Sequence, residues 1–231
     1  MSKSKPQTVL TKAILWKLFL QAYQIRNGKH FVQTPDTLEN MAPLIEYFTR
    51  DPKFLQRERL VRHIDNQPLL AGFQKGLLIV GAYGNGKTSC MEALQLVFSH
   101  YRLPMRFSGY KAHDLVSEYE RIGADPTFGE SSKYQFYQRL ILPKSLYIDD
   151  VKKEREAYNY GKVNLIRDIL EKRYDHKGSV THITCNYRDG DTNNDVEDAL
   201  SDFGEKYGGH IYDRLFAMFN ILEFKGKTFR R

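Results

Sequence analysis

The sequence has little of what disulfide-bonded, zinc-binding or membrane-spanning proteins need. Only two cysteines, Cys90 and Cys185, occur among 231 residues. Both fall on expected core elements, so we interpret them as small buried hydrophobic residues rather than as a disulfide or a metal pair. No apolar run approaches the ~20 residues that a membrane-spanning helix requires. The sequence therefore predicts a protein without a membrane partner.

The N-terminal residues lack the features of a secretory signal peptide. The first residues are basic, but the run at 13–22 is interrupted by Lys17 and Gln21, and no small-residue cleavage site follows. There is no internal repeat and no low-complexity segment. With 41% hydrophobic and 27% charged residues, the composition is that of an ordinary globular chain. We expect a cytoplasmic protein with one sizeable α/β domain and a small appendage.

The net charge of +7 is unevenly distributed. Residues 1–75 contain 12 Lys and Arg against 6 Asp and Glu, whereas the rest contains 23 against 22. A basic surface is typical of nucleic-acid binding, although a solvated surface would have the same composition.

Residues 76–89 contain the most informative motif in the chain. An apolar run at 77–80 is long enough for one buried strand. The segment from Gly81 to Thr88 then reads G-x-x-x-x-G-K-T, and residues 90–97 continue as a helix. A glycine-rich turn could precede a helix by chance, but strand, glycine loop and helix in this order are the context that supports a P-loop.

The residue types of this loop suit a nucleotide triphosphate. Glycines let backbone N–H groups turn towards phosphate oxygens without a Cβ in the way, and the helix N-terminus adds partial positive charge. Lys87 would reach the β- and γ-phosphates, and the Thr88 hydroxyl would ligate Mg²⁺. We therefore expect ATP and Mg²⁺ as cofactors. The expected nucleotide-binding residues are Gly81, Tyr83, Gly84, Asn85, Gly86, Lys87, Thr88 and Ser89.

A second motif supplies carboxylates. The apolar stretch 146–148 ends in Asp149 and Asp150, which is the Walker B arrangement. Asp149 is expected to hold Mg²⁺ beside Thr88, and Asp150 to orient and polarise the attacking water. Asn186 follows the next apolar strand and could position the same water from the opposite side. Each of these features alone is also compatible with ordinary turn chemistry.

Arg214 is the candidate for stabilising charge on a transferred phosphoryl group. Leu215, Met218 and Phe219 form the expected packed face of its helix, which leaves Arg214 free to project. An arginine supplied to a γ-phosphate stabilises the charge that develops during transfer. The alternative is a surface arginine paired with Asp213 or Glu223.

The remaining elements alternate between strand and helix. Such alternation predicts a mostly parallel sheet with helices on both faces, a P-loop NTPase core. Trp16, Leu20 and Tyr23 widen the apolar face of the first helix, so this helix is either buried on two sides or meets a partner. Helices are expected at 11–24, 36–47, 53–63, 112–122, 131–142, 162–174, 194–203 and 209–218, and strands at 77–80, 104–108, 145–148, 180–185 and 221–224.

Five segments in order resemble the DnaC/IstB-type AAA+ ATPases, the helicase-loader family, from about Gly76 to the C-terminus. Beyond the P-loop, they are the double Asp with Glu154, the helix ending in Arg173-Tyr174, Thr184-Cys185-Asn186, Asp213-Arg214-Leu215, and Gly226-Lys227-Thr228-Phe229-Arg230. The chain departs from the family where Val151-Lys152-Lys153 replaces the glycine that usually follows the double Asp, and where His210 stands for the first basic residue of the arginine-finger box.

The resemblance implies an AAA+ ATPase core at 71–231, with no C-terminal lid domain and with Arg230 as the sensor-2-like residue. It implies action in DNA replication on a replicative helicase, with a homo-oligomer forming on ATP or single-stranded DNA and Arg214 acting on a neighbour's nucleotide. An IstB-like transposition ATPase with a transposase partner is the close alternative. A P-loop kinase and a nucleotide-switched binding module are further ones. Residues 1–70 are expected to be a helical segment that docks the partner or contacts DNA.

Overall fold

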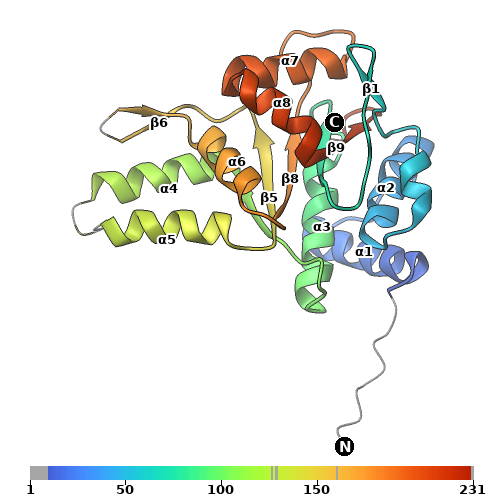
Figure 1. The fold of residues 1–231 in the computed structure, drawn as a ribbon. Helices are drawn as coiled ribbons and strands as arrows, with labels where there is room; N and C mark the ends of the chain where they lie inside the picture. The colour runs from blue at the N-terminus through green and yellow to red at the C-terminus, as the bar shows by residue number, and fades with distance from the viewer. Residues whose placement is uncertain (1–9, 126, 128–129, 160, 230–231) are drawn as a thin grey trace, which may run out of the picture.

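A five-stranded parallel sheet forms the centre of the computed structural model, which describes residues 10–125, 127, 130–159 and 161–229 (Figure 1). Across the sheet the strands are β4 (Ser108–Lys111), β5 (Ser145–Val151), β8 (Val180–Cys185), β3 (Gly76–Gly81) and β9 (Phe219–Phe224). Every neighbouring pair is parallel, so all five carboxyl ends lie at one edge of the sheet. Loops at that edge of an open α/β sheet are where ligands bind.

The side chains of the buried strands are apolar on both faces of the sheet, so both faces have to be covered. Helices cover both of them. One face packs on α1 (Lys12–Asn27), α2 (Pro35–Phe48) and α3 (Lys87–His100). The other packs on α4 (Ala112–Ala124), α5 (Glu130–Ile141), α6 (Leu165–Asp175), α7 (Val196–Tyr207) and α8 (Gly209–Met218). Strand β3 shows the division: Leu77 and Ile79 join the first core, and Leu78 and Val80 join the second.

The N-terminal helices pack directly on the P-loop helix α3. Leu15 and Phe19 of α1 are fully buried, and Arg26 forms a two-point ion pair with Glu92 of α3 at 2.7 and 2.8 Å. Tyr23 is only 8% exposed. The sequence allowed the wide apolar face of α1 either to be buried on two sides or to meet a partner. In the structure α1 is buried on two sides, against α2 and α3.

The prediction of a third helix at 53–63 is wrong. Only a 3₁₀ turn forms, Pro52–Gln56, and the chain then runs antiparallel along the outer edge of β9. The Val61 N–H donates to the Ile221 carbonyl at 2.9 Å, and the Glu223 N–H donates to the Arg59 carbonyl at 2.8 Å. Backbone groups on an edge strand need partners, and meeting that need outweighs the modest helical preference of a charged segment.

Two further boundaries differ from expectation. The turn-forming residues of Asn66-Gln67-Pro68 indicate a linker into the sheet domain, but this segment belongs to a hairpin of β1 (His63–Ile64) and β2 (Gln67–Pro68). Asp65 and Asn66 turn this hairpin with φ of 48° and 60°, as a two-residue hairpin loop requires. The second core strand is Ser108–Lys111 instead of 104–108, because residues 103–106 form a turn in which the Arg106 N–H donates to the Leu103 carbonyl at 3.0 Å.

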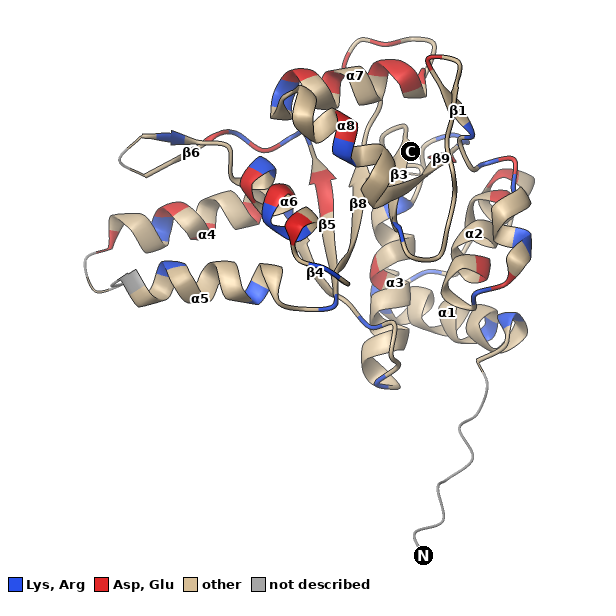
Figure 2. Ribbon diagram, viewed as in Figure 1, with Lys and Arg blue, Asp and Glu red and all other residues tan. Residues whose placement is uncertain are grey.

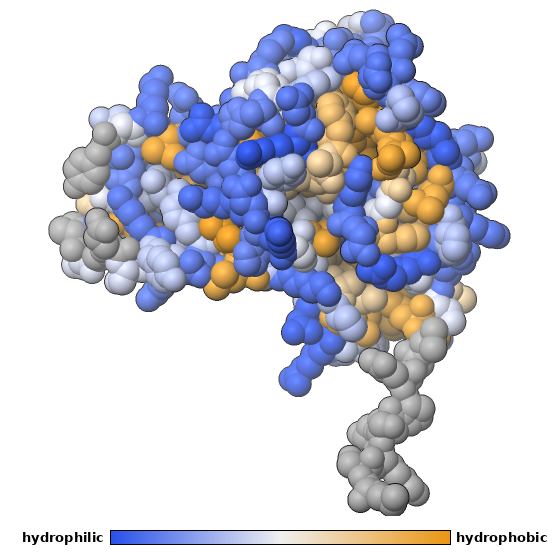
Figure 3. Space-filling model, viewed as in Figure 1, coloured by the Kyte–Doolittle hydropathy of each residue, from blue (hydrophilic) through white to orange (hydrophobic). Residues whose placement is uncertain are grey.

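A small hairpin that the sequence did not reveal follows β5, made of β6 (Ala157–Tyr158) and β7 (Lys162–Val163). It projects from the body beside α4 (Figure 1). None of the helices in the described part of the chain is long and apolar enough to cross a membrane. Polar side chains cover most of the face shown in Figure 3, and acidic residues mark the carboxyl end of β5 in Figure 2.

Candidate active site

The loop between β3 and α3 has the conformation that its glycines predict. Gly84 and Gly86 have φ of 74° and 96°, in the left-handed region that favours glycine. A Cβ at Gly81 would lie 2.5 Å from the Phe224 carbonyl oxygen, so a larger residue would displace β9. Asn85 is buried, and its amide donates to that same carbonyl at 2.8 Å. The Asn85 side chain therefore holds the loop against the sheet.

Lys87 is the buried cation of the loop, only 4% exposed. Its ammonium donates to the carbonyls of Gly81 at 2.7 Å and Ala82 at 2.9 Å, and to the Asn186 amide oxygen at 3.1 Å. A buried charge is tolerated only when it is well paired. These contacts keep the ammonium inside the loop and connect it to the tip of β8.

Thr88 and Asp149 meet at the first turn of α3. The Thr88 hydroxyl donates to Oδ1 of Asp149 at 3.0 Å, and the same oxygen accepts the hydroxyls of Tyr147 and Thr184 at 2.5 Å each. Asp149 is 3% exposed. Burial raises the pKa of its carboxyl, and the hydrogen bonds from Thr184 and Tyr147 lower it in part. Three hydroxyls thus fix the orientation of one carboxylate.

Strand β5 is irregular at Asp150, where the regular alternation of side chains along a strand is interrupted. Ile148 pairs with Ile183 of β8, but the next pair is Val151 with Cys185, so β5 has one extra residue. Asp150 lies in this bulge with φ of 53°. Bulges re-aim side chains next to functional sites. Through this one, two consecutive carboxylates take up different positions beside the phosphate loop.

Asn186 joins the two halves of the site. Its Oδ1 accepts from Lys87, and its Nδ2 lies 3.5 Å from Oδ1 of Asp150. Asn186 is 3% exposed, so its amide has little freedom to turn away. The phosphate loop, the tip of β5 and the tip of β8 therefore converge, as the motifs predicted.

Lys87, Thr88, Asp150 and Asn186 line a cleft of about 270 Å³, and Asp149 lies behind Thr88 outside its lining. Its walls include Gly84 to Ser89, Asp150 and Asn186, and also residues that the sequence did not single out. Three of these, Tyr23, Asn27 and Lys29, come from the end of α1 and the residues after it, and Phe229 comes from the C-terminal segment. No local motif marks Tyr23, Asn27 or Lys29 as cleft residues, and the C-terminal motif that contains Phe229 did not indicate a cleft role for it, because all four reach the cleft only through packing of the two chain ends.

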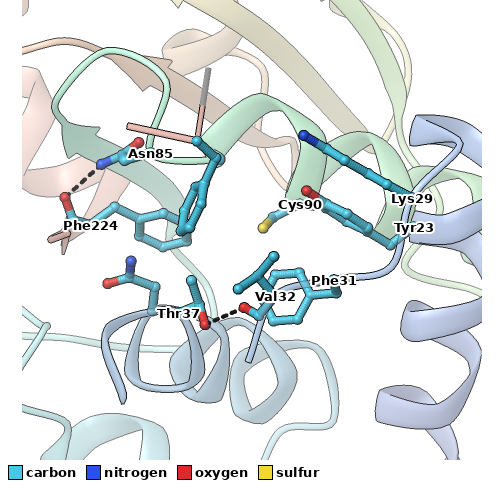
Figure 4. A pocket seen from close by; sticks show the side chains of 11 residues that line it. Tyr23, Lys29, Phe31, Val32, Thr37, Asn85, Cys90 and Phe224 are labelled. Atoms are coloured by element: carbon cyan, nitrogen blue, oxygen red, sulfur yellow. Dashed lines mark hydrogen bonds between the residues drawn. The ribbon is translucent and has the colours of Figure 1, made fainter. Parts of the chain in front are cut away.

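An apolar recess adjoins this cleft. Figure 4 shows Tyr23, Phe31 and Val32 on one side, Phe224 and Asn85 on the other, and Cys90 between them. Phe229 also lines it, and the Phe229 N–H donates to the Gly84 carbonyl at 3.0 Å. The free volume is only about 20 Å³, so a planar base would have to displace a lining side chain.

Tyr83 of the loop turns outward. Its ring is 50% exposed, its hydroxyl donates to Asp189 at 2.7 Å, and the Lys153 ammonium lies 4.9 Å from the ring centroid. Tyr83 lines the cleft, but its hydroxyl bonds to Asp189, which lies outside the lining.

Arg214 does not line the cleft of its own chain. Its guanidinium lies 4.6 Å from the centre of the Tyr174 ring on α6. Among the described residues it forms no ion pair with Asp213 or Glu223, so the surface ion pair weighed from the sequence is wrong. Arg173, the neighbour of Tyr174, is buried and donates to four carbonyls and the Thr181 hydroxyl, which anchors this end of α6. Arg230 falls outside the described residues.

Known structures share the fold. No protein-family model matches the chain, and the curated proteins give no match either. Among solved structures, a DnaC helicase loader aligns over 91% of this chain and 98% of its own, with 18% identity and a TM-score of 0.57. A protein assigned as a primosome component of Streptococcus pyogenes aligns over 87% and 85%, with 14% identity and a TM-score of 0.53. The α/β fold expected from the sequence, a mostly parallel sheet with helices on both faces, is confirmed, and these solved structures share it.

Proposed function

We propose that this protein binds and hydrolyses ATP with Mg²⁺. The observation that carries the proposal is the convergence of Lys87, Thr88, Asp149, Asp150 and Asn186 at one edge of the sheet. A structural role alone does not require a buried ammonium, a bulged carboxylate pair and a buried amide at the end of a glycine loop. Together they supply what phosphoryl transfer needs, namely phosphate binding, metal binding and orientation of water.

The donor set fits Mg²⁺. The Thr88 hydroxyl and the Asp149 carboxylate are hard oxygen ligands 3.0 Å apart, and Mg²⁺ in NTPases binds to one or two such groups plus phosphates and water. The ion neutralises charge that develops on the phosphate oxygens. The hydroxyls of Tyr147 and Thr184 hold Asp149 in place and so limit its reorganisation.

Asp150 and Asn186 would act on the water. Asp150 is half-buried and lies beside the cleft, where its carboxylate can accept a proton from, or orient, a water molecule. Glu154 is the less suitable base, because its Oε1 already accepts from Tyr207 at 2.8 Å and lies 3.3 Å from the Lys206 ammonium.

The recess beside the cleft is proposed to take the adenine. Aromatic and aliphatic side chains dominate its lining, which suits a planar apolar base. Its tightness without a ligand implies that Phe229 or Lys29 moves when nucleotide enters. The position of Phe229 or of Lys29 would then differ between the nucleotide-free and the nucleotide-bound protein.

We further propose that the protein loads or remodels a replicative helicase on DNA. The likeness to a DnaC helicase loader over nearly the whole of both chains supports this role. The rival partner, a transposase, has no comparable support. Arg214 would act on a neighbouring subunit's nucleotide, because it is half-exposed and lies outside its own cleft. Hydrolysis would then depend on a homo-oligomer, formed on ATP or single-stranded DNA.

A pull-down from the native host tests the partner. Tagged wild-type protein, with ATP and Mg²⁺, should retain a hexameric helicase, and a Lys87→Ala control should retain less if nucleotide gates docking. Recovery of a transposase without any helicase would contradict the loader assignment and favour the transposition ATPase.

A further inference from the structure

The backbone that carries Asp150 is held in an unfavourable conformation. Asp150 has φ of 53° and Lys152 has φ of 77°, and neither is glycine. Left-handed backbone is unfavourable for a residue with a Cβ, and it persists only where the surroundings enforce it.

The end of α7 supplies the contacts that enforce this conformation. The Lys152 N–H donates to the Tyr207 hydroxyl oxygen at 2.8 Å, and the Lys206 ammonium donates to the Lys152 carbonyl at 2.8 Å. Both backbone groups of the strained residue are therefore bound by neighbouring residues of one helix. The Lys152 side chain returns to the same helix, where it donates to the Ala199 carbonyl at 3.0 Å and to Asp202 at 2.7 Å.

The Tyr207 hydroxyl is the centre of this arrangement. Tyr207 is 1% exposed, and its hydroxyl accepts from the Lys152 N–H while it donates to Glu154 at 2.8 Å. Burial raises the pKa of Tyr207 well above its ordinary value, so the hydroxyl keeps its proton and remains a donor to Glu154. One buried hydroxyl thus fixes both ends of the segment 152–154 that follows Asp150.

We propose that Tyr207 is a positioning residue for Asp150, acting through the backbone of Lys152. This inference rests on the proposed ATPase function. Asp150 is connected to the body on its other side by its N–H, which donates to Thr184 at 3.0 Å. Without the Tyr207 hydroxyl, the Lys152 N–H would lose its partner, and the strained backbone after Asp150 would be held only by Lys206 and by the Lys152 side chain. The carboxylate would then sample positions away from the attacking water, with the nucleotide-binding residues unchanged.

The test is Tyr207→Phe, which keeps the ring and removes the hydroxyl. We expect kcat for ATP to fall by roughly 10- to 100-fold, because a misplacement of about 1 Å can cost on the order of 10²-fold. KM and the affinity for a fluorescent ATP analogue should change less than about threefold, since Tyr207 does not line the cleft. The matched control is Tyr187→Phe, which removes a hydroxyl bonded to Glu223 and should leave kcat unchanged.

A second variant separates positioning from stability. Adding Lys152→Gly to Tyr207→Phe removes the cost of the left-handed backbone and should restore part of the lost kcat. An unchanged kcat in Tyr207→Phe, or a loss that Lys152→Gly does not relieve at all, would overturn the inference while leaving the ATPase assignment intact. A wild-type protein without turnover under assembly conditions would instead overturn the proposed function, and this inference with it.

Discussion

The three acidic residues at the end of β5 and just after it each have a distinct environment. Asp149 is buried and accepts three hydroxyls, Asp150 lies in a bulge, and Glu154 is bonded to α7. Environment, more than residue type, decides which carboxylate can bind a metal and which can act on water. The sequence identified the Asp pair, but it could not show that Glu154 is bonded away from the cleft.

This difference between the carboxylates predicts the outcome of two substitutions that replace a carboxylate by an uncharged amide. Asp150→Asn should leave ATP binding intact and reduce turnover by roughly 10²-fold or more, as expected for loss of a general base. Glu154→Gln should reduce turnover much less, because Glu154 does not line the cleft. Steady-state phosphate release measures both. The reverse order of effects would identify Glu154 as the residue that orients the water.

Residue burial also predicts a pH dependence of stability. His182 is buried, its Nδ1 accepts from the Leu77 N–H at 3.2 Å, and burial lowers its pKa from 6.5 to about 3. Between these values the unfolded state binds a proton that the folded state does not. The free energy of unfolding should therefore fall as pH decreases below 6.5, by up to about 1.4 kcal/mol per pH unit from this group.

His182→Gln removes the titrating group and keeps a hydrogen-bond acceptor. Urea titrations from pH 4 to 7 should then show that the free energy of unfolding of this variant depends less steeply on pH than that of wild type. The difference in slope should correspond to at most one proton. Equal slopes for the two proteins would show that His182 does not remain neutral in the fold.

At the scale of elements, the sheet and its motifs could be predicted, and the packing of the chain ends could not. The P-loop, the Walker B strand and the tip of β8 follow from local patterns, since parallel strands end at one edge. The strand-like path of residues 59–61 and the cleft contacts of Tyr23 and Phe229 depend on partners more than 60 residues away in the chain. No local periodicity encodes such pairings.

The packing of α1 changes one expectation. From the sequence, removal of residues 1–66 is predicted to leave ATP binding intact and to end partner association. In the structure this segment covers α3 and contributes Tyr23, Asn27 and Lys29 to the cleft. We now expect the truncated protein to lose nucleotide binding and stability, because it exposes the apolar face of α3.

A point substitution isolates the base recess from this larger effect. Phe31→Ala should weaken binding of ATP by about 1–3 kcal/mol through loss of apolar contact, while inorganic triphosphate binding stays unchanged. Tyr101→Ala, an exposed aromatic outside both pockets, is the control. Equal losses for ATP and triphosphate in isothermal titration would indicate general damage, and the recess would not be the base site.

At the scale of the whole molecule, the position of Arg214 makes assembly testable. Its guanidinium stacks on Tyr174, away from its own cleft, so a neighbouring subunit is its proposed target. Arg214→Ala and Lys87→Ala subunits would fail at different places. A mixture contains some interfaces with an intact phosphate loop facing an intact Arg214, and these should recover hydrolysis that neither variant shows alone.

Mixed assembly has to be demonstrated by cross-linking of differently tagged subunits. If mixed oligomers form and no activity returns, Arg214 has no role on a neighbour's nucleotide and only stabilises α6 against α8.

The cleft around Lys87 is proposed to bind ATP for hydrolysis, and every other proposed role depends on this binding. The most direct measurement is equilibrium binding of a fluorescent ATP analogue, with Mg²⁺, to the full-length wild-type and Lys87→Ala proteins, with matched thermal melting curves. We predict tight binding to wild type and loss of tight binding to the folded variant, because the charge nearest the β- and γ-phosphates is gone. Binding of equal affinity to both proteins would contradict the claim.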